Sequence, residues 1–255
     1  MSAEIKEFAK GLADSAGAVI KPYFRHNVGV IDKADDSPVT IADRNAETAI
    51  RDVIEERFPG HGIFGEEHGV KEGDGTHMWV LDPIDGTRSF ICGAPWFGTL
   101  IAYLENQKPI IGVLDVPMMG ERWVGSAEGT TYNGEFCQVR NGVIFEEASL
   151  FTTDYDLFDD DQKAAFDRVK SQVKCIRYGT DCYAYGLLAS GHIDLVIEAG
   201  LKPYDAMALV PVIKGAGGIV TGWNGEEVDL DWDGRIIAAA TIELHEKALT
   251  LLNRE

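Results

Sequence analysis

The segment at 79–87, WVLDPIDGT, constrains this chain more than any other part of its sequence. An apolar run that predicts a β-strand ends in two aspartates, Asp82 and Asp85, which flank a proline and an isoleucine. Ligands bind in open α/β sheets beyond the strand ends, so both carboxylates are expected at a binding region. Two such carboxylates repel each other unless a cation lies between them, and hard oxygen ligands favour Mg²⁺ over zinc or copper. The segment therefore predicts a cation site at the end of a strand.

The two residues that follow, Gly86 and Thr87, suit the binding of an anion. Glycine lets the backbone approach a ligand closely, and backbone N–H groups face a phosphate if a helical turn begins here. The alternative interpretation is an ordinary Asp-Gly turn in which the aspartates act only as caps. The combination of nine residues favours a functional site over that turn.

Three further acidic positions extend the pattern. Glu66 and Glu67 follow a glycine just before the strand, Asp43 stands near the start of a predicted helix, and Asp205 opens another helix in the second half. Each position also has a purely structural interpretation. Glu66 and Glu67 can belong to a solvated loop, and Thr40, Asp43 or Asp205 can be a helix cap or an acid of a first turn.

Apolar periodicity divides the chain into two halves, at about 1–140 and 141–255. The first half has predicted helices at 5–23 and 42–57, a loop at 61–76, strands at 78–81, 99–104, 110–114 and 122–124, and a hairpin turn at Asn133-Gly134. The second half has predicted helices at 160–171, 182–190, 205–214 and 243–252, and strands at 173–178, 193–198, 219–221 and 236–239. We expect an α/β protein with an α+β first half around an antiparallel sheet and an α/β second half. No free linker separates the halves, so residues 1–255 are predicted to form one unit.

The charge balance is strongly acidic, with 42 acidic and 23 basic residues and a formal net charge of −19. This balance provides no basic surface for nucleic acid, and anionic membranes would repel the chain. No secretory signal and no run long enough to span a bilayer is visible, so we expect a cytoplasmic protein. The four cysteines form no C-x-x-C pair, so no zinc or redox motif is predicted.

Together these motifs resemble the inositol monophosphatase family. The resemblance is carried by the segments at 82–87, 65–67, 39–43, 204–205 and 215–218, and it covers nearly the whole chain. It implies a layered αβαβα sandwich that acts as a single catalytic unit. It also implies a cytoplasmic, Mg²⁺-dependent homodimer that hydrolyses a small phosphate ester.

The resemblance further implies how the site residues act. Two or three Mg²⁺ ions would be held by Glu66, Asp82, Asp85, Asp205 and the backbone carbonyl of Ile84, with Glu67 in an outer shell. Asp85, Gly86 and Thr87 would be substrate-binding residues, with the N–H groups of Gly86 and Thr87 facing the phosphate. Thr87, hydrogen-bonded to Asp43, would orient and deprotonate a metal-bound water with Glu66 as a further catalytic residue, and that water would attack phosphorus directly. Metal ions suit this chemistry because they acidify water and clamp both the entering and the leaving oxygen.

Two acidic residues of the second half predict the organic part of the substrate. Asp181 stands where inositol-hydrolysing members of the family typically carry a small neutral residue. Glu198 lies seven residues before Asp205, which matches the family's substrate-contacting glutamate. Two carboxylates favour a leaving group with positive charge or several N–H donors, whereas a sugar gains little from an extra carboxylate that must be desolvated. Histidinol phosphate, an ester of histidine biosynthesis, meets this requirement, and the segments at 85–100, 112–117 and 121–125 also resemble the histidinol-phosphatase branch.

Several alternatives stay open within the family. Inositol monophosphate, fructose bisphosphate and adenosine bisphosphate are the other substrates, and Asp181 has a second interpretation as a helix N-cap. We expect Arg88 to pair with a surface acid rather than with the phosphate. Trp96 and Phe97 are expected in the core rather than against the substrate.

Two other classes of function are less consistent with the sequence. An aspartyl-phosphate mechanism uses a D-x-D spacing, whereas Asp82 and Asp85 have the spacing D-x-x-D. Strand alternation would point these two side chains to opposite sides unless the chain turns at Pro83. A non-catalytic metal- or phosphate-binding protein would lack part of the constellation, which is complete here.

Overall fold

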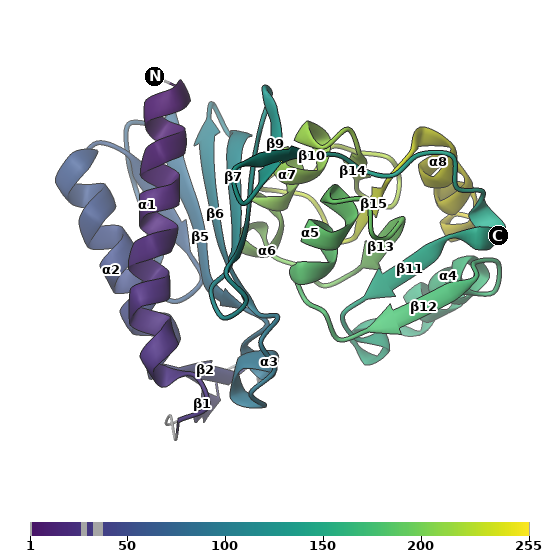
Figure 1. The fold of residues 1–255 in the computed structure, drawn as a ribbon, viewed down its shortest axis with the longest axis horizontal. Helices are drawn as coiled ribbons and strands as arrows, with labels where there is room; N and C mark the ends of the chain where they lie inside the picture. Colours follow the sequence, from purple (N-terminus) through teal and green to yellow (C-terminus); the bar gives the residue numbers. More distant parts are fainter. Residues whose placement is uncertain (1, 27–29, 33–37, 255) are drawn as a thin grey trace.

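The chain forms five alternating layers of helices and sheets in a computed structural model that describes residues 2–26, 30–32 and 38–254. The first half, which begins in purple in Figure 1, lies at one end of the molecule, and the second half, which runs from teal at β11 to yellow, lies at the other. Both ends of the chain lie at the periphery of the molecule in this view. The architecture is the αβαβα sandwich that the resemblance implied.

The outer layer of the first half consists of α1 (Ser2–Ile20) and α2 (Ile41–Arg57). These helices pair with each other and cover one face of a large sheet (Figure 1). The buried residues of α1 recur at helical spacing and are Ile5, Ala9, Leu12, Ala13, Ala16 and Ile20. The predicted helix at 5–23 is confirmed except for its last turn, which is the 3₁₀ helix η1 (Lys21–Tyr23). Pro22 lacks the N–H group that an α-helical hydrogen bond would need there.

The large sheet has eight strands in the order β10-β9-β8-β7-β6-β5-β3-β4. The strands are β3 (Gly62–Gly65), β4 (Gly69–Lys71), β5 (His77–Asp85), β6 (Gly98–Glu105), β7 (Lys108–Val116), β8 (Glu121–Ser126), β9 (Gly129–Tyr132) and β10 (Glu135–Cys137). All neighbours are antiparallel except β3 and β5, which are parallel. The predicted hairpin is confirmed, because Asn133 and Gly134 join β9 to β10 with positive φ angles of 48° and 91°.

The predicted loop at 61–76 is wrong, because this stretch contains β3 and β4. Many glycines surround a short apolar run in this stretch, so the run was not recognised as a strand. Ile63 in this run is fully buried. Strands of three or four residues carry too little alternation to be recognised alone. Pairing with β5, from Gly62 opposite Met78 to Gly65 opposite Leu81, stabilises β3 in the sheet.

The second sheet has five strands in the order β12-β11-β13-β15-β14. They are β11 (Ser149–Thr152), β12 (Cys175–Tyr178), β13 (Leu195–Glu198), β14 (Ile219–Thr221) and β15 (Ile236–Ala239). Strand β11 is parallel to both β12 and β13, whereas β15 is antiparallel to its neighbours. The helices α4 (Asp160–Lys170) and α8 (Ile242–Leu252) pack together at the outer side of this sheet (Figure 1).

The layer between the sheets contains α5 (Tyr183–Ala189), α6 (Pro203–Ala206) and α7 (Leu209–Gly215). The single helix predicted at 205–214 is therefore wrong, since it is interrupted at Met207 and Ala208. Pro211 cannot donate a hydrogen bond to the carbonyl of Met207, four residues earlier, which breaks the helix at that point.

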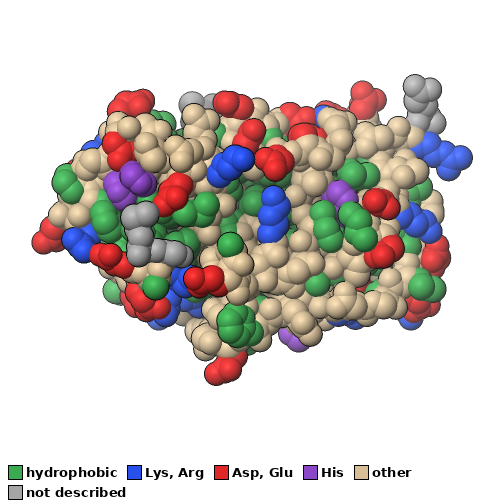
Figure 2. Space-filling model, turned by 90° about the horizontal axis from the view of Figure 1, so that it is seen from above, with side chains coloured by type: hydrophobic (Ala, Val, Ile, Leu, Met, Phe, Trp, Pro, Cys, Tyr) green, Lys and Arg blue, Asp and Glu red, His purple; other side chains and the backbone are tan. Residues whose placement is uncertain are grey.

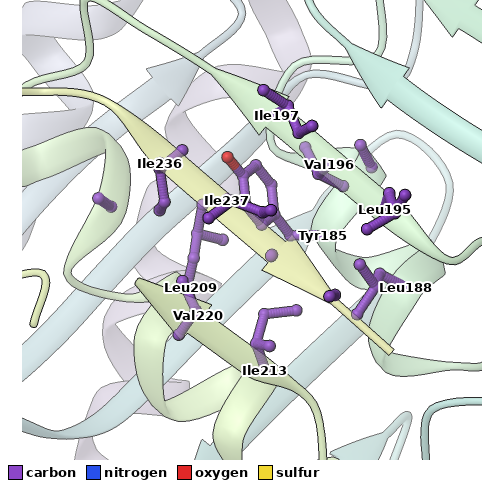
Figure 3. Packing of buried hydrophobic residues seen from close by; sticks show 14 of the residues in the cluster. Tyr185, Leu188, Leu195, Val196, Ile197, Leu209, Ile213, Val220, Ile236 and Ile237 are labelled. Carbon is purple, nitrogen blue, oxygen red and sulfur yellow. The ribbon is translucent and has the colours of Figure 1, made fainter. Parts of the chain in front are cut away.

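The core of the second half lies on both faces of the five-stranded sheet, against the middle layer on one side and against α4 and α8 on the other. Figure 3 shows part of this cluster, with side chains from α5, α7 and three strands: Tyr185, Leu188, Leu195, Val196, Ile197, Leu209, Ile213, Val220, Ile236 and Ile237. In the first half Phe97 is fully buried against Phe24, with ring centroids 5.4 Å apart, as expected. The expectation for Trp96 is wrong, because 37% of this residue is exposed.

The remaining elements are short. They are the strand pair β1 (Val30–Asp32) and β2 (Pro38–Thr40), the helix α3 (Thr87–Ile91), and the 3₁₀ helices η2 (Phe145–Glu147) and η3 (Tyr155–Leu157). Among the described residues, no helix combines the length and the apolar character needed to cross a membrane. Acidic side chains are spread around the face shown in Figure 2 rather than gathered in one patch.

Candidate active site

A pocket of about 440 Å³ is lined by residues of both halves. The first half contributes Glu66 and the segment from Asp85 to Ser89, and the second half contributes Thr153, Asp154, Asp181, Cys182, Tyr185, Glu198 and Asp205. Most of the polar residues predicted for the site therefore line one cavity. It lies at the carboxyl end of β5, where the sequence predicted a binding region, and also at the carboxyl end of β13.

An irregularity in β5 brings its two aspartates to the same side. The register of β5 against β6 shifts between Asp82 and Asp85. Thr99 Oγ1 donates a hydrogen bond of 2.8 Å to the carbonyl of Pro83 and so holds this bulge in place. Because of the bulge, one carboxylate oxygen from each of Asp82, Asp85 and Asp205 lies within 4.8 Å of the other two. The side chains of Asp82 and Asp85 thus converge, whereas regular strand alternation would have pointed them to opposite sides of the sheet.

Asp205 acts as a helix-capping residue and as part of this cluster at the same time. It is the third residue of α6, and its Oδ2 accepts a hydrogen bond of 2.7 Å from the N–H of Lys202. The interpretation of Asp205 as the N-cap itself is wrong, because Lys202 occupies that position. The capping bond holds the carboxylate beside Asp82 rather than turning it toward solvent.

Asp43 has the same position in α2, behind the N-cap residue Thr40. Its Oδ2 accepts a hydrogen bond of 2.9 Å from the N–H of Thr40. Its Oδ1 lies 3.4 Å from Thr87 Oγ1, which also lies 3.1 Å from the carbonyl oxygen of Ile84. The cap and the contact with Thr87 use different oxygens, so the structural and the functional interpretation of Asp43 are compatible.

The raised pKa values of the clustered aspartates indicate a repulsion that a bound cation would relieve. Burial raises the pKa of Asp82 well above its ordinary value, and the charges of Glu66, Asp85, Asp205 and Asp43 raise it further. The pKa of Asp85 is also raised well above its ordinary value, first by burial and then by Asp181 and Asp205. Burial raises the pKa of Asp205 to about 7. Buried carboxylates that repel one another and offer only oxygen ligands fit a hard divalent ion such as Mg²⁺.

Glu66 and Glu67 lie beside this cluster. Glu66 lines the pocket, and its charge raises the pKa of both Asp82 and Asp205. The solvated-loop interpretation is wrong for Glu67, since only 2% of its side chain is exposed and Arg44 Nε lies 3.7 Å from its carboxylate. The charge of Glu67 also contributes to raising the pKa of Asp43.

The segment after β5 contacts the second half at Gly86. This residue has a φ of +84°, and a Cβ added to it would lie 2.7 Å from the carboxyl carbon of Asp181. A side chain at position 86 would therefore be strained and would also displace Asp181. The contact fixes the distance between the predicted phosphate segment and the predicted specificity residue.

Asp181 is not the N-cap of α5, so that alternative is wrong. The N-cap position belongs to Cys182, whereas Asp181 Oδ2 accepts a hydrogen bond of 2.5 Å from Ser89 Oγ. Burial raises the pKa of Asp181. Arg88 pairs with an acid, Asp154, at 3.8 Å, as expected, and both residues are exposed but also line the pocket.

Glu198 is buried and held by two groups of the second half. Its Oε2 accepts a hydrogen bond of 2.7 Å from the hydroxyl of Tyr185, and its Oε1 accepts one of 2.9 Å from the N–H of Thr153. Burial raises its pKa, and the charge of Asp181 raises it further. Both predicted specificity residues thus line the pocket and interact electrostatically.

Sequence reasoning missed several residues that hold these groups: Glu47, Ser89, Thr99 and Tyr185. The clearest available signal was for Glu47, which lies four residues after Asp43 and therefore shares its helix face. For Thr99 and Tyr185 no local pattern was available, because their partners are distant in sequence.

A second cluster that also offers metal ligands lies at the opposite end of β5, where ligand atoms of His61, Asp74 and His77 are within 4.8 Å of one another. The two imidazole rings are stacked, with centroids 4.7 Å apart and planes inclined by 18°. One ion cannot lie in both of two stacked ring planes, as in-plane nitrogen lone pairs would require. In addition, Trp79 Nε1 donates to His61 Nδ1 at 3.1 Å. The aspartate cluster is therefore the better candidate.

Comparisons with known proteins agree with the fold. The model of the inositol monophosphatase family matches residues 1–255. The chain is 47% identical over 264 residues to the chloroplastic bifunctional phosphatase IMPL2 of Arabidopsis thaliana, covering 98% of this chain and 76% of that protein. It is 35% identical over 236 residues to the histidinol-phosphatase of Chlorobaculum parvum, covering 91% of each. A solved structure of an inositol monophosphatase from Zymomonas mobilis superposes with a TM-score of 0.90 at 43% identity and covers 98% of both chains.

Proposed function

The chain belongs to the inositol monophosphatase family, and on this premise we propose that it is a Mg²⁺-dependent phosphatase that hydrolyses histidinol phosphate. The broader class, a phosphoric monoester hydrolase, follows from the family and its phosphatase members. The substrate rests on one observation, which is the pair of buried carboxylates Asp181 and Glu198 in the pocket.

These two carboxylates favour a cationic leaving group. The charge of Asp181 raises the pKa of Glu198, so the two carboxylates repel each other. A neutral polyol would leave that repulsion in place, whereas an ammonium or an imidazolium would relieve it and supply N–H donors. The guanidinium of Arg88 offsets the charge of Asp181 only in part, because 68% of its side chain is exposed and solvent screens it. Histidinol phosphate carries both cationic groups.

We assign the orientation of the attacking water to Thr87 and Asp43. The Thr87 hydroxyl lies near Asp43 Oδ1 and the Ile84 carbonyl, and while it donates to either oxygen its own oxygen can accept from a water in the pocket. Burial raises the pKa of Asp43, which suits a carboxylate that takes up a proton during the reaction. Glu66, at the pocket wall, is the other proposed catalytic carboxylate. Attack by water in line with the leaving oxygen requires no phosphorylated aspartate.

The remaining assignments complete the site. The ions, two or three Mg²⁺, would be held by Glu66, Asp82, Asp85, Asp205 and the Ile84 carbonyl. When bound they supply the positive charge that acidifies a water and neutralises the phosphoryl oxygens. The N–H groups of Gly86 and Thr87 would bind the phosphate group, and Asp85 would contact the substrate through the ions that it holds. Because both halves line the pocket, we propose that 1–255 acts as one catalytic unit of the halves 1–140 and 141–255. A cytoplasmic homodimer active in histidine biosynthesis is proposed from the family resemblance.

A second candidate substrate is inositol monophosphate. The Zymomonas mobilis structure, named an inositol monophosphatase, shares 43% of its aligned residues with this chain. This likeness favours the same phosphate chemistry, whereas the leaving group is selected by Asp181 and Glu198.

The test is release of inorganic phosphate by the purified protein. We expect hydrolysis of histidinol phosphate with Mg²⁺, none with a chelator, and a lower kcat/KM for inositol 1-phosphate. A higher kcat/KM for the inositol ester would overturn the proposed substrate. Activity that survives complete removal of divalent ions would overturn the proposed chemistry as well.

A further inference from the structure

The turn that carries Glu66 is fastened to helix α2 by a buried carboxylate. Glu47 is fully buried on α2. Its Oε2 accepts a hydrogen bond of 2.7 Å from the N–H of Glu67, and its Oε1 accepts one of 3.1 Å from the N–H of His68. The two amides directly after Glu66 are therefore both held by one side chain.

Position 65, directly before Glu66, accepts only glycine in this arrangement. A Cβ added to Gly65 would lie 2.0 Å from Glu47 Oε1, so only glycine lets the backbone come this close to the carboxylate. The N–H of Glu66 donates to the carbonyl of Leu81 at 3.2 Å. The backbone of Glu66 is thus held on one side by β5 and on the other by α2.

The partners of Glu47 lie on the same face of α2. Asp43, Glu47 and Arg51 follow one another at intervals of four residues and share that face. Arg51 Nε donates to Glu47 Oε1 at 2.7 Å, which balances the buried charge, and Arg51 Nη2 donates to the carbonyl of Gly69. Asp43, on the turn of α2 before Glu47, contacts Thr87. One rigid helix therefore supports both the Glu66 turn and the Thr87 side of the pocket.

We propose that Glu47 is a positioning residue of the metal centre, which holds the Glu66 turn so that the Glu66 carboxylate faces the Asp82 cluster. The inference rests on the metal centre proposed above. If Glu47 served stability alone, its buried ion pair with Arg51 would be sufficient. Glu47 also accepts hydrogen bonds from both backbone amides after Glu66, which that ion pair does not require. Removing a residue that orients a metal ligand typically lowers metal affinity about 10- to 100-fold.

The decisive variant is Glu47→Gln, which keeps the size of the side chain but removes its charge and one acceptor oxygen. Asp194→Asn is the matched control. Asp194 is also fully buried, pairs with Arg140, and accepts a hydrogen bond of 2.7 Å from the N–H of Ser149, but it does not line the pocket. Both variants lose the charge of a fully buried carboxylate that pairs with an arginine, and only the first affects the Glu66 turn.

Mg²⁺ binding to each full-length protein is measured by titration calorimetry with MgCl₂ alone, and thermal unfolding is recorded in parallel. We expect Glu47→Gln to weaken Mg²⁺ affinity about 10- to 100-fold, while Asp194→Asn retains the affinity of the unchanged protein at a similar loss of thermal stability. Equal affinities in the two variants, with binding intact in the unchanged protein, would overturn this inference alone. Absence of Mg²⁺ binding in the unchanged protein would overturn the metal centre itself.

If Glu47→Gln does not fold, Glu47→Asp provides the same comparison. It keeps the charge beside Arg51 but is one methylene too short to reach both amides. Weaker Mg²⁺ affinity in a stable Glu47→Asp variant supports the inference, and unchanged affinity contradicts it.

Discussion

Asp85 Oδ2 accepts a hydrogen bond of 2.7 Å from the backbone N–H of Cys182, 97 residues further along the chain. The bond connects the end of β5 in the first half with the start of α5 in the second. Asp181, the residue before Cys182, contacts Gly86, the residue after Asp85. The proposed metal ligand and the proposed specificity residue are therefore positioned by one junction between the halves.

The substitution Asp181→Ala tests the substrate. A hydrogen bond to a charged group contributes roughly 1.5–3 kcal/mol, which corresponds to about a 10- to 100-fold loss of kcat/KM for histidinol phosphate. The loss for inositol 1-phosphate should be much smaller, because that ester presents no cation to the carboxylate. Steady-state kinetics on both esters measure the difference. Asp156→Ala, which removes an exposed carboxylate outside the pocket, is the control, and equal losses on the two esters after Asp181→Ala would exclude the specificity argument.

The substitution Asp82→Asn distinguishes a loss of catalysis from a loss of folding. The Oδ1 atom of Asp82 accepts a hydrogen bond of 3.0 Å from the N–H of Ile84, and asparagine can retain this bond. The variant should fold, but it loses charge at the metal site. Because metal stabilisation of the transition state contributes several kcal/mol, we expect a loss of kcat of roughly 10³-fold. Initial rates with Mg²⁺ and thermal unfolding without it measure the two effects, and full activity in a folded variant contradicts the proposed site.

The stability of the metal-free protein should depend on pH through Asp205. Burial raises the pKa of this group from 3.8 to about 7, so the folded chain keeps a proton that the unfolded chain releases. Its contribution to stability is therefore fully present below pH 3.8 and is lost as the pH rises through about 7. Bound Mg²⁺ favours the ionised carboxylate, so stabilisation by the ion should increase over the same range.

Thermal unfolding at pH 5 and pH 8, with chelator or with Mg²⁺, measures this dependence. The variant Asp205→Asn serves as the reference, because subtracting its profile removes titrating groups outside the aspartate cluster such as His61, whose pKa is lowered by burial, and leaves the titration of Asp205 with its coupling to Asp82 and Asp85. Identical pH profiles for the metal-free protein and the variant would contradict the prediction.

Much of the local structure was predictable, since its causes are local. The long helices follow from apolar residues at helical spacing, and the turn at Asn133-Gly134 follows from two residues that tolerate positive φ. The strand β5 follows from an apolar run at 79–81, although the strand itself continues to Asp85. The resemblance of these motifs to a known family also led to the correct layered fold.

The convergence of the site was decided by the tertiary structure. Nothing near Asp85 in the sequence indicates Cys182 as its partner, and nothing near Glu66 indicates that Glu47 holds the following amides. The glycine-rich strand β3 likewise forms only because β5 pairs with it. Local patterns determine which elements a chain can form, because periodicity and turn chemistry extend over a few residues. Which carboxylates share a pocket depends on sheet register, on the bulge between Asp82 and Asp85 and on the docking of α5 and α6, which only packing across the whole chain determines.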